Sequence, residues 1–320
     1  MALIAGVGMV PFVTPSRTEN YDVMAERATR AALSDAGVEY ADVKQAFVGY
    51  VYGDSAAGQR SLYRVGTSGI PVVNVNNNCS TGSSALFLAR QAIEHGAAEV
   101  VLALGFEQMQ RGALSAMWND RPTALDRFQE VLEDAHGLTE APMAAQLFGA
   151  AGQEYADANG LEVDAFARIA VKARAHASNN PYAVFRDQVT VEEVLGSPQI
   201  SGPLTRLQCC PPTCGAAAAV LVSSEYARRN QLDAKVAIKA QSMTTDSDST
   251  FTGNSMLSLV GYDMARSAAQ MVYHDSGVDP LDIPVVELHD CFTTNELLSY
   301  EALGLTPEGT AEKFIADGDN

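Results

Sequence analysis

The sequence predicts an α/β protein in which helices cover a largely parallel sheet. Two observations carry this prediction. A strand-like run, a polar turn and a helix of small residues follow one another over residues 71–95, and a second apolar strand is expected at Val100–Leu104. A pattern of amphipathic helix, glycine, acidic turn and apolar strand also occurs twice in the chain, which is typical of duplicated β-α-β units.

The repeated pattern keeps a constant offset, since Gly277 lies 240 residues after Gly37. In the first copy we expect a helix over 25–37 and a strand at 46–52, and in the second a helix over 265–277 and a strand at 285–289. A further strand-like segment precedes each copy, at Ala2–Gly6 and at Val236–Ala240.

The repeat also predicts the domain organisation. The first half comprises 1–108 and 205–232, closing with a strand at 216–222, and the second half comprises 233–320. Residues 109–204 read as an inserted segment whose clearest helices are Met143–Asn159 and Val163–Asn179. The counterpart of Cys79 in the second copy would fall at position 319, so we expect the second half to be incomplete.

Composition and charge exclude several classes of function. The 320 residues carry a net charge of −18 and a pI near 4.6, which disfavours nucleic acid and anionic membranes as partners. The sequence has no apolar run long enough for a membrane span and no secretory signal pattern. Five cysteines in such a chain indicate reduced thiols in a cytosol-like compartment.

Cys79 is the most informative single residue, because it lies where the predicted turn meets the predicted helix. Unpaired backbone N–H groups and the positive end of the helix dipole favour a thiolate at such a position. Polar Asn76–Asn78 and Ser80 would make a suitable rim for a reactive site. The alternative is a small buried hydrophobic residue, the commonest role of a free cysteine.

Two other groups of residues carry weaker signals. Cys209, Cys210 and Cys214 lack paired C-x-x-C spacing and a nearby histidine, which disfavours zinc. The Gly6-Val7-Gly8 run lacks the third glycine and the acidic residue of a dinucleotide fingerprint.

A basic cluster stands out in this acidic protein. It consists of Arg168, Lys172 and Arg174 with His176. Two interpretations are open: a solvated helix face, or a contact with phosphate groups.

The segment Glu287–Glu296 forms a second candidate site. It follows the expected strand at 285–289, and parallel sheets place active sites beyond the carboxyl ends of their strands. His289 and Cys291 would offer a hydrogen-bond donor and an acid/base thiol there. The alternative is a buried polar network that caps a helix at 297–304, with Thr293 or Thr294 as the N-cap.

Four stretches together carry a resemblance to a known family: 74–86, 209–219, 260–264 and 289–305. The last reads His-Asp-Cys-Phe-Thr-Thr-Asn-Glu-Leu-Leu-Ser-Tyr-Glu-Ala-Leu-Gly-Leu. With these motifs the chain resembles, over essentially its whole length, the thiolase domain of sterol carrier protein 2, the SCP2-thiolase subgroup of the thiolase superfamily. The resemblance implies the thiolase fold: two similar βαβαβαββ halves, with a helical loop domain inserted in the first.

The resemblance also implies an activity, the CoA-dependent cleavage of a branched-chain or sterol side-chain 3-oxoacyl-CoA. Cys79 would be the nucleophile that carries the acyl group, Cys291 the acid/base thiol, and His289 a holder of the thioester oxygen. CoA would be a co-substrate, with no permanently bound cofactor and no metal, and Arg168, Lys172 and Arg174 would contact its phosphates.

Two departures from the family pattern concern this sequence. The family's Gly-His-Pro motif, whose histidine activates the nucleophile, has no counterpart among the five histidines of the 320 residues. Cys214 stands where the commoner form has Asp, which we interpret as a packing variation.

Two other functions stay open. One is a retro-aldolase acting on a steroid side-chain CoA, although such relatives lose the thiolase cysteines. The other is a non-catalytic CoA- or lipid-binding fragment, or one subunit of a split thiolase. The resemblance further implies a homodimer or homotetramer. The Ala-rich, acidic composition agrees with a bacterial cytoplasmic setting, and in a eukaryote we would expect a peroxisomal one.

Overall fold

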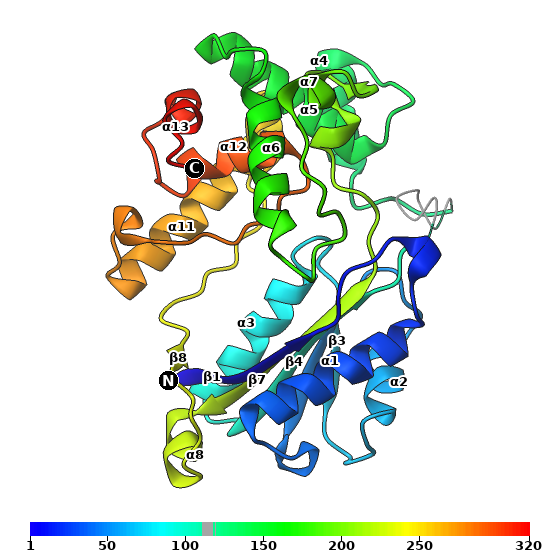
Figure 1. Cartoon of the computed structure of the whole chain (residues 1–320), viewed down its shortest axis with the longest axis vertical. Coiled ribbons are helices and arrows are strands. Elements are labelled where there is room, and N and C mark those ends of the chain that lie inside the picture. Colours follow the sequence, from blue (N-terminus) through cyan, green and yellow to red (C-terminus); the bar gives the residue numbers. More distant parts are fainter. Residues whose placement is uncertain (111–117, 119) are drawn as a thin grey trace. The chain divides into compact units, whose positions relative to one another are not determined.

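The computed structural model describes residues 1–110, 118 and 120–320, whose contacts form two compact units (Figure 1). Unit 1 comprises Met1–Ala113, Pro181–Val184 and Pro211–Gln241. Unit 2 comprises Leu114–Asn180, Phe185–Cys210 and Ser242–Asn320. The units are groups of contacts, and the domain boundaries drawn from the repeat stay a prediction.

A six-stranded mixed sheet forms the centre of unit 1, in the order β3-β2-β4-β7-β1-β8 (Figure 1). The strands are β1 (Ala2–Met9), β2 (Gln45–Gly49), β3 (Val72–Val75), β4 (Val100–Glu107), β7 (Gly215–Ser223) and β8 (Val236–Ala237). Only β3, β2 and β4 pair in parallel, while β7 is antiparallel to both β4 and β1, and β8 is antiparallel to β1. The prediction of a largely parallel sheet is therefore wrong, because β7 re-enters the sheet after the long inserted segment and runs antiparallel to both of its neighbours.

Helices cover both faces of this sheet. The helices α1 (Tyr21–Ala36) and α2 (Ala57–Tyr63) share one apolar cluster with Val48 and Leu102. The helix α3 (Thr81–Glu94) shares another cluster with Phe47 and Val101, the neighbours of those residues along β2 and β4. Successive side chains of a strand point to opposite faces, so the two clusters lie on opposite sides of the sheet.

The order of elements in unit 1 is β1-α1-β2-α2-β3-α3-β4-β7, which confirms the expected βαβαβαββ arrangement of the first half. Short 3-10 turns at Pro15–Arg17 and Tyr40–Asp42 and the helix α8 (Ser224–Arg229) complete the unit. The predicted strand at 71–75 forms as β3, but it is an edge strand that pairs only with β2. It is therefore not buried as expected, and Val73 is 40% exposed.

Gly6 and Gly8 have a packing role in β1. A Cβ atom on Gly6 would lie 2.2 Å from the backbone nitrogen of Ala36, and one on Gly8 would lie 2.4 Å from the carbonyl oxygen of Ala28. Glycine therefore allows α1 to lie directly against the backbone of the strand. This contact accounts for the glycine pair without a dinucleotide site.

Unit 2 is mainly helical. Its helices are α4 (Asp126–His136), α5 (Met143–Asn159), α6 (Ala165–Ser178), α7 (Val191–Leu195), α9 (Asp248–Thr252), α10 (Met256–Leu259), α11 (Tyr262–Ser276), α12 (Thr293–Ala302) and α13 (Ala311–Asp317). A small sheet pairs β5 (Gln199–Ser201) with β6 (Leu204–Thr205), and 3-10 turns occur at Arg206–Gln208 and Pro280–Asp282. The two helices predicted in the inserted segment are confirmed as α5 and α6.

The two copies of the repeat share their local structure up to the expected strand. Both α1 and α11 end at a glycine in the left-handed region, Gly37 with φ 63° and Gly277 with φ 67°. A 3-10 turn follows each glycine three residues later, at Tyr40–Asp42 and Pro280–Asp282. The helix, its cap and the turn are therefore repeated as predicted.

The strand expected at 285–289 does not form, and this prediction is wrong. Residues 283–290 carry no strand assignment, and Val285 is 78% exposed. A strand needs a neighbour to satisfy its backbone N–H and C=O groups. The other expected strand of this copy, at 236–240, is shortened to β8 and pairs with β1.

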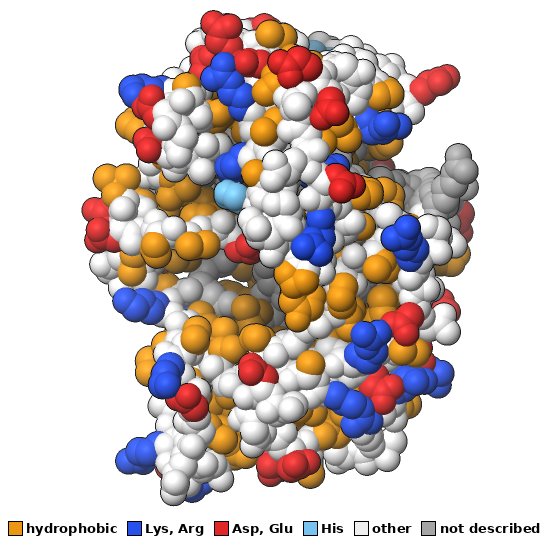
Figure 2. Space-filling model, in the orientation of Figure 1, with side chains coloured by type: hydrophobic (Ala, Val, Ile, Leu, Met, Phe, Trp, Pro, Cys, Tyr) orange, Lys and Arg blue, Asp and Glu red, His pale blue; other side chains and the backbone are white. Residues whose placement is uncertain are grey.

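Charges of both signs are mixed on the surface. Lys and Arg side chains lie among Asp and Glu side chains on the face drawn in Figure 2. In the described part of the chain, no helix has both the length and the apolar character needed to cross a bilayer.

We expect Gly8→Ala to lower the free energy of unfolding by about 1–3 kcal/mol, because its methyl group would overlap the backbone of α1. Urea unfolding measures the change. The matched control is Gly253→Ala, where φ is −109° and a Cβ would meet nothing within 4 Å. Equal losses of stability in the two variants would contradict the packing role of Gly8.

Candidate active site

Cys79 lies in the turn that joins β3 to α3, as the sequence predicts. The Ser80 N–H donates to the Asn77 carbonyl at 3.1 Å, and the Thr81 N–H donates to the Asn78 carbonyl at 3.1 Å. The Thr81 hydroxyl in turn accepts a hydrogen bond from the Asn77 N–H at 2.8 Å. The turn is thus closed by its own backbone, with Cys79 exposed at its tip.

Asn78 gives this turn its sharpness. Its φ is 45°, in the left-handed region that L-residues rarely adopt and that asparagine tolerates better than most. The sequence analysis placed Asn78 only on the rim of the site. Its backbone conformation makes it a structural determinant of where the thiol points.

The pKa of the Cys79 thiol lies above its ordinary value, opposite to the predicted direction. Although Cys79 is exposed at the surface, the protein atoms around its sulfur remove part of the water that would solvate a thiolate, and this is the larger cause of the raised pKa; a hydrogen bond from its own backbone N–H opposes it only in part. The N–H groups of Ser80 and Thr81, which were expected to be unpaired, are bonded to Asn77 and Asn78. The helix terminus alone therefore does not keep the thiol ionised.

The first turn of α3 packs against the carboxyl end of β2. A Cβ atom on Gly49, the last residue of β2, would lie 2.7 Å from the Thr81 side chain and 3.0 Å from the Thr81 carbonyl oxygen. Only glycine allows this approach. The result places Cys79 beyond the carboxyl ends of the parallel strands, where such sheets bind their ligands.

Glu107 and Tyr52 belong to the surroundings of Cys79, and the sequence analysis missed both. Glu107, the last residue of β4, accepts hydrogen bonds from the N–H groups of Val51 at 3.0 Å and Tyr52 at 3.1 Å. Burial raises the pKa of Glu107, and these hydrogen bonds oppose the shift. Burial and then the charges of Glu107 and Cys79 raise the pKa of Tyr52. An acidic residue directly after an apolar strand was the available signal.

In unit 2, the turn that carries His289 and Cys291 is held from both sides. The Cys210 N–H donates to the Cys291 carbonyl at 2.8 Å, and Cys209 forms an antiparallel bridge with Phe292. The Asn295 side-chain amide donates to the His289 carbonyl at 2.6 Å. The Cys-Cys pair of the sequence therefore supports the His-Asp-Cys-Phe motif.

His289 and Cys291 have different environments. Cys291 is buried, whereas His289 is exposed at the surface. Protein atoms around the His289 ring remove part of its water and lower its pKa, which favours the neutral imidazole. Of the alternative interpretation, the helix cap by Thr293 or Thr294 is wrong, whereas a buried polar network does form, around Glu296. Phe292 is the N-cap of α12, and neither threonine hydroxyl has a hydrogen-bond partner among the described residues.

Asp290, between His289 and Cys291, belongs to a buried charged cluster. Its carboxyl group is hydrogen-bonded to Glu296, and burial, followed by the Glu296 charge, raises the pKa of Asp290 to about 7. Lys172 of α6 forms an ion pair with Glu296 and donates to the Tyr300 hydroxyl at 3.2 Å. The Tyr300 hydroxyl donates to Glu296 Oε1 at 2.5 Å.

The predicted phosphate contacts have partners within the protein. Arg168 pairs with Asp164 at 2.9 Å, and the Arg174 guanidinium lies 4.9 Å from the centre of the Phe185 ring. The Lys172 side chain is 22% exposed, half as much as the 44% of Arg168. Their role in binding CoA stays a prediction.

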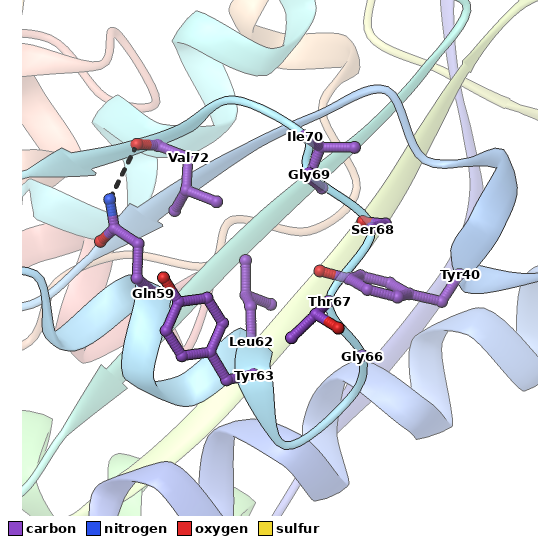
Figure 3. A pocket seen from close by; sticks show the side chains of 10 residues that line it. All are labelled: Tyr40, Gln59, Leu62, Tyr63, Gly66, Thr67, Ser68, Gly69, Ile70 and Val72. Atoms are coloured by element: carbon purple, nitrogen blue, oxygen red, sulfur yellow. Dashed lines mark hydrogen bonds between the residues drawn. The ribbon is translucent and has the colours of Figure 1, made fainter.

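Two pockets lie away from these residues. In unit 1, a cavity of about 420 Å³ lies beside α2 and the 66–72 segment, lined by Tyr40, Gln59 and Tyr63 among others (Figure 3). In unit 2, an apolar groove of about 520 Å³ runs along α11. Neither is lined by Cys79, His289 or Cys291, although Glu287, the first residue of the second candidate segment, lines the groove along α11.

Metal binding finds no support in the geometry. No group of three or more His, Cys, Asp or Glu side chains within residues 1–110, 118 and 120–320 is arranged to hold a metal ion. Cys214 lies in the core of unit 1, while Cys209 and Cys210 belong to unit 2.

The structure brings His289 and Cys291 together on one turn of unit 2, and it places Cys79 on a turn of unit 1. Joint action of the three residues on one substrate stays a prediction.

Comparison with known proteins identifies the family. The family described as thiolase, N-terminal domain, matches residues 2–225, and the thiolase C-terminal domain-like family matches residues 246–320. The chain belongs to the thiolase family. Its fold is accordingly the thiolase fold, as the sequence predicts.

Similar proteins place this thiolase in the SCP2-thiolase subgroup. Sterol carrier protein 2 of Oryctolagus cuniculus is 49% identical over 99% of the chain, and the match covers 59% of that protein. The chain thus spans less than two thirds of the sterol carrier proteins it matches. Non-specific lipid-transfer protein-like 2 of Caenorhabditis elegans is 40% identical over 99% of the chain and 79% of its own length.

One further relative and one solved structure are also similar to this chain. Benzoylsuccinyl-CoA thiolase subunit BbsB of Thauera aromatica is 34% identical over 99% of the chain and 78% of that protein. A solved structure, the Ltp2-ChsH2(DUF35) aldolase, superposes with a TM-score of 0.80 at 29% identity, covering 99% of this chain and 80% of that one.

We expect Asn78→Ala to destabilise the protein by about 1 kcal/mol, because alanine is disfavoured at positive φ. Asn78→Gly should keep or raise the stability, since glycine adopts this conformation freely. Urea unfolding of both variants provides the measurement. A greater loss with glycine than with alanine would show that the asparagine side chain, and not its backbone, holds the turn.

We expect Cys79 to react slowly with iodoacetamide at pH 7, because its raised pKa leaves little thiolate. The rate should rise with pH, with a midpoint above that of a free cysteine. Peptide mass spectrometry after timed alkylation reports the rate at Cys79 alone. A midpoint below that of free cysteine would mean that the helix terminus dominates over burial.

Proposed function

We propose that this protein is a thiolase-type acyltransferase that cleaves 3-oxoacyl-CoA through an acyl-enzyme on Cys79. The observation that carries the proposal is the position of Cys79, which lies at the tip of a turn beyond the parallel strands in a chain of the SCP2-thiolase subgroup. The resemblance to sterol carrier protein 2 supports branched-chain or sterol side-chain acyl groups, and hence a role in β-oxidation or sterol degradation.

The first half-reaction forms the acyl-enzyme. The thiolate form of Cys79, a minor fraction because the pKa of the thiol is raised, attacks the 3-keto carbon, and the Cys79 backbone N–H stabilises the negative charge on the oxygen. The bond between C2 and C3 then breaks, leaving the shortened acyl group on sulfur and an enolate of acetyl- or propionyl-CoA. The Cys291 thiol gives its proton to the α-carbon of that enolate.

The second half-reaction releases the product. The Cys291 thiolate regains a proton from the thiol of incoming CoA, whose thiolate attacks the Cys79 thioester. The shortened acyl-CoA leaves and the Cys79 thiolate is restored. His289 holds the thioester oxygen where enolate charge develops, and as a neutral imidazole it can donate one hydrogen bond there.

Arg168, Lys172 and Arg174 are the candidates for contacts with CoA phosphates. The guanidinium groups of Arg168 and Arg174 keep surface access, while Lys172 is more enclosed. Acyl-CoA and CoA are thus the small-molecule partners, and we expect a homodimer or homotetramer. We further expect a bacterial cytoplasmic setting, or a peroxisomal one in a eukaryote.

A retro-aldolase acting on a steroid side-chain CoA is the second candidate. The structural similarity to the Ltp2-ChsH2(DUF35) aldolase favours it. The presence of Cys79 and Cys291 favours thiolysis, because aldol cleavage needs no cysteine acyl carrier. The two reactions therefore differ in whether an adduct forms on Cys79.

A subunit of a split enzyme, or a non-catalytic CoA- or lipid-binding fragment, is the third candidate. The Thauera aromatica relative is itself a thiolase subunit, which favours the first form. Either form predicts CoA binding without turnover by the isolated chain. Measuring the Cys79 adduct and the thiolysis of a 3-oxoacyl-CoA distinguishes both forms from the leading proposal.

We expect an acyl adduct on Cys79 when the protein is incubated with 3-oxooctanoyl-CoA, and thiolysis when CoA is also present. Cys79→Ser should abolish the adduct and lower kcat/KM by about 10³-fold or more. Intact and peptide mass spectrometry detect the adduct, and loss of the 3-oxoacyl-CoA absorbance follows turnover, in this chain and in one extended at its C-terminus.

Cys214→Ala is the matched control, because Cys214 lies in the core of unit 1. It should retain the adduct and the turnover. If the extended protein also gives neither an adduct on Cys79 nor Cys79-dependent cleavage, the thiolase proposal is wrong. Cleavage of a 3-hydroxyacyl-CoA without an adduct would favour the aldolase.

A further inference from the structure

Two carboxyl groups share one buried position behind the turn that carries His289 and Cys291. Asp290 and Glu296 are hydrogen-bonded to each other, and the Glu296 side chain is only 4% exposed. Two carboxylates cannot form such a bond unless one carries a proton. The pair is therefore a carboxylic acid bonded to a carboxylate.

One cation accompanies this pair. Lys172 reaches from α6 to α12, where its ammonium pairs with Glu296 and bonds to the Tyr300 hydroxyl at 3.2 Å. With one proton shared between the carboxyl groups, the charges of Lys172, Glu296 and Asp290 sum to zero. This neutral state is the one that burial favours.

Two further polar groups, the Tyr300 hydroxyl and the Asn320 side-chain amide, complete the cluster. Tyr300 bonds to Glu296 at 2.5 Å, and its raised pKa keeps its proton available for that bond. The Asn320 side-chain amide donates to the Tyr300 hydroxyl at 3.0 Å. On the same two helices, Arg168 pairs with Asp164, and Glu301 accepts a hydrogen bond from the Tyr155 hydroxyl.

We propose that Lys172 is a positioning residue, whose ammonium holds Glu296 against Asp290 and so fixes the turn that presents His289 and Cys291. This inference rests on the proposed function and names a residue that the reaction needs without touching the substrate. Asp290 lies directly between the two site residues, so displacement of its carboxyl group moves both. It also changes the role of Lys172 from a phosphate contact to an internal support.

The arrangement predicts how the cluster responds to pH. Asp290 takes its proton below about pH 7, which keeps the cluster neutral, and loses it above that pH, which adds a second buried negative charge. Because its folded-state pKa is raised, its contribution to stability is full at low pH and is lost as the pH rises through about 7.

We expect Lys172→Met to lower kcat by about 10- to 100-fold with little change in KM for 3-oxooctanoyl-CoA or CoA, because the turn loses its position. The pH profile of kcat should also change, since the remaining carboxyl pair keeps its proton to higher pH. Lys172→Arg should recover part of the loss. Lys313→Met is the matched control, since Lys313 pairs with Asp317 on the exposed face of α13, and it should behave as the wild type.

Two results would overturn the proposal. A folded Lys172→Met with unchanged kcat and pH profile would show that the ammonium is dispensable. A raised KM for CoA with unchanged kcat would assign Lys172 to phosphate binding. If Lys172→Met does not fold, the double variant Lys172→Met/Glu296→Gln removes both charges of the ion pair. Its kcat should then be only slightly lower than that of Glu296→Gln alone. A kcat of the double variant far below that of Glu296→Gln would contradict the coupling.

Measurements without substrate separate this proposal from the thiolase reaction itself. Infrared spectroscopy should show a protonated carboxyl band that disappears with a midpoint near pH 7 and is missing in Asp290→Asn. Alkylation of Cys291 should become faster in Lys172→Met, and not in Lys313→Met, as the turn loosens. If wild-type turnover is absent but these results appear, the proposed function fails while the support by Lys172 stands. If the band and the change in alkylation are both absent, the support itself is wrong.

Discussion

The geometry of the candidate nucleophile depends on how closely the first turn of α3 approaches the end of β2. Gly49 leaves just enough space for Thr81, and Thr81 in turn bonds to Asn77 and closes the turn around Cys79. Asn78 has an unfavourable positive φ, and the hydrogen bonds of the Ser80 and Thr81 N–H groups to the Asn77 and Asn78 carbonyls hold it in that conformation. At the neighbouring strand end, Glu107 fastens the loop at Val51 and Tyr52. The thiol is therefore placed by backbone contacts more than by its own side-chain partners.

Local signals in the sequence predicted local structure well. The strand–turn–helix around Cys79, the bounds of α5 and the glycine caps at Gly37 and Gly277 depend on residues close in the chain, and all are confirmed. Features that need a distant partner were predicted poorly. The antiparallel place of β7, the exposure of β3 and the missing strand at 285–289 all depend on which segments pair, which periodicity does not encode.

The site residues show the same division. Cys79, His289 and Cys291 were predicted from motif and position, and their roles stay predictions, whereas the neighbours that shape their surroundings were missed. The sign of the shift at Cys79 depends on how many atoms surround the thiol, and the bond from Lys172 to Glu296 joins residues 124 positions apart. In this protein of net charge −18, Asp290 of the His-Asp-Cys turn and the buried Glu296 lie together, and Lys172 forms an ion pair with Glu296. Such a cluster lends little stability but specifies one arrangement of its members.

The strand order of unit 1 has a consequence for synthesis and folding. The strand β7 lies between β4 and β1, yet more than 100 residues separate it from β4 along the chain, and about 200 separate it from β1. Until β7 leaves the ribosome, the inner edges of β1 and β4 have no neighbour and expose unpaired backbone groups. The helices of the inserted segment emerge before β7 and can form from local contacts alone. The sheet that carries the nucleophile is thus completed late, and a chaperone that protects open strand edges would act on this nascent chain within that interval.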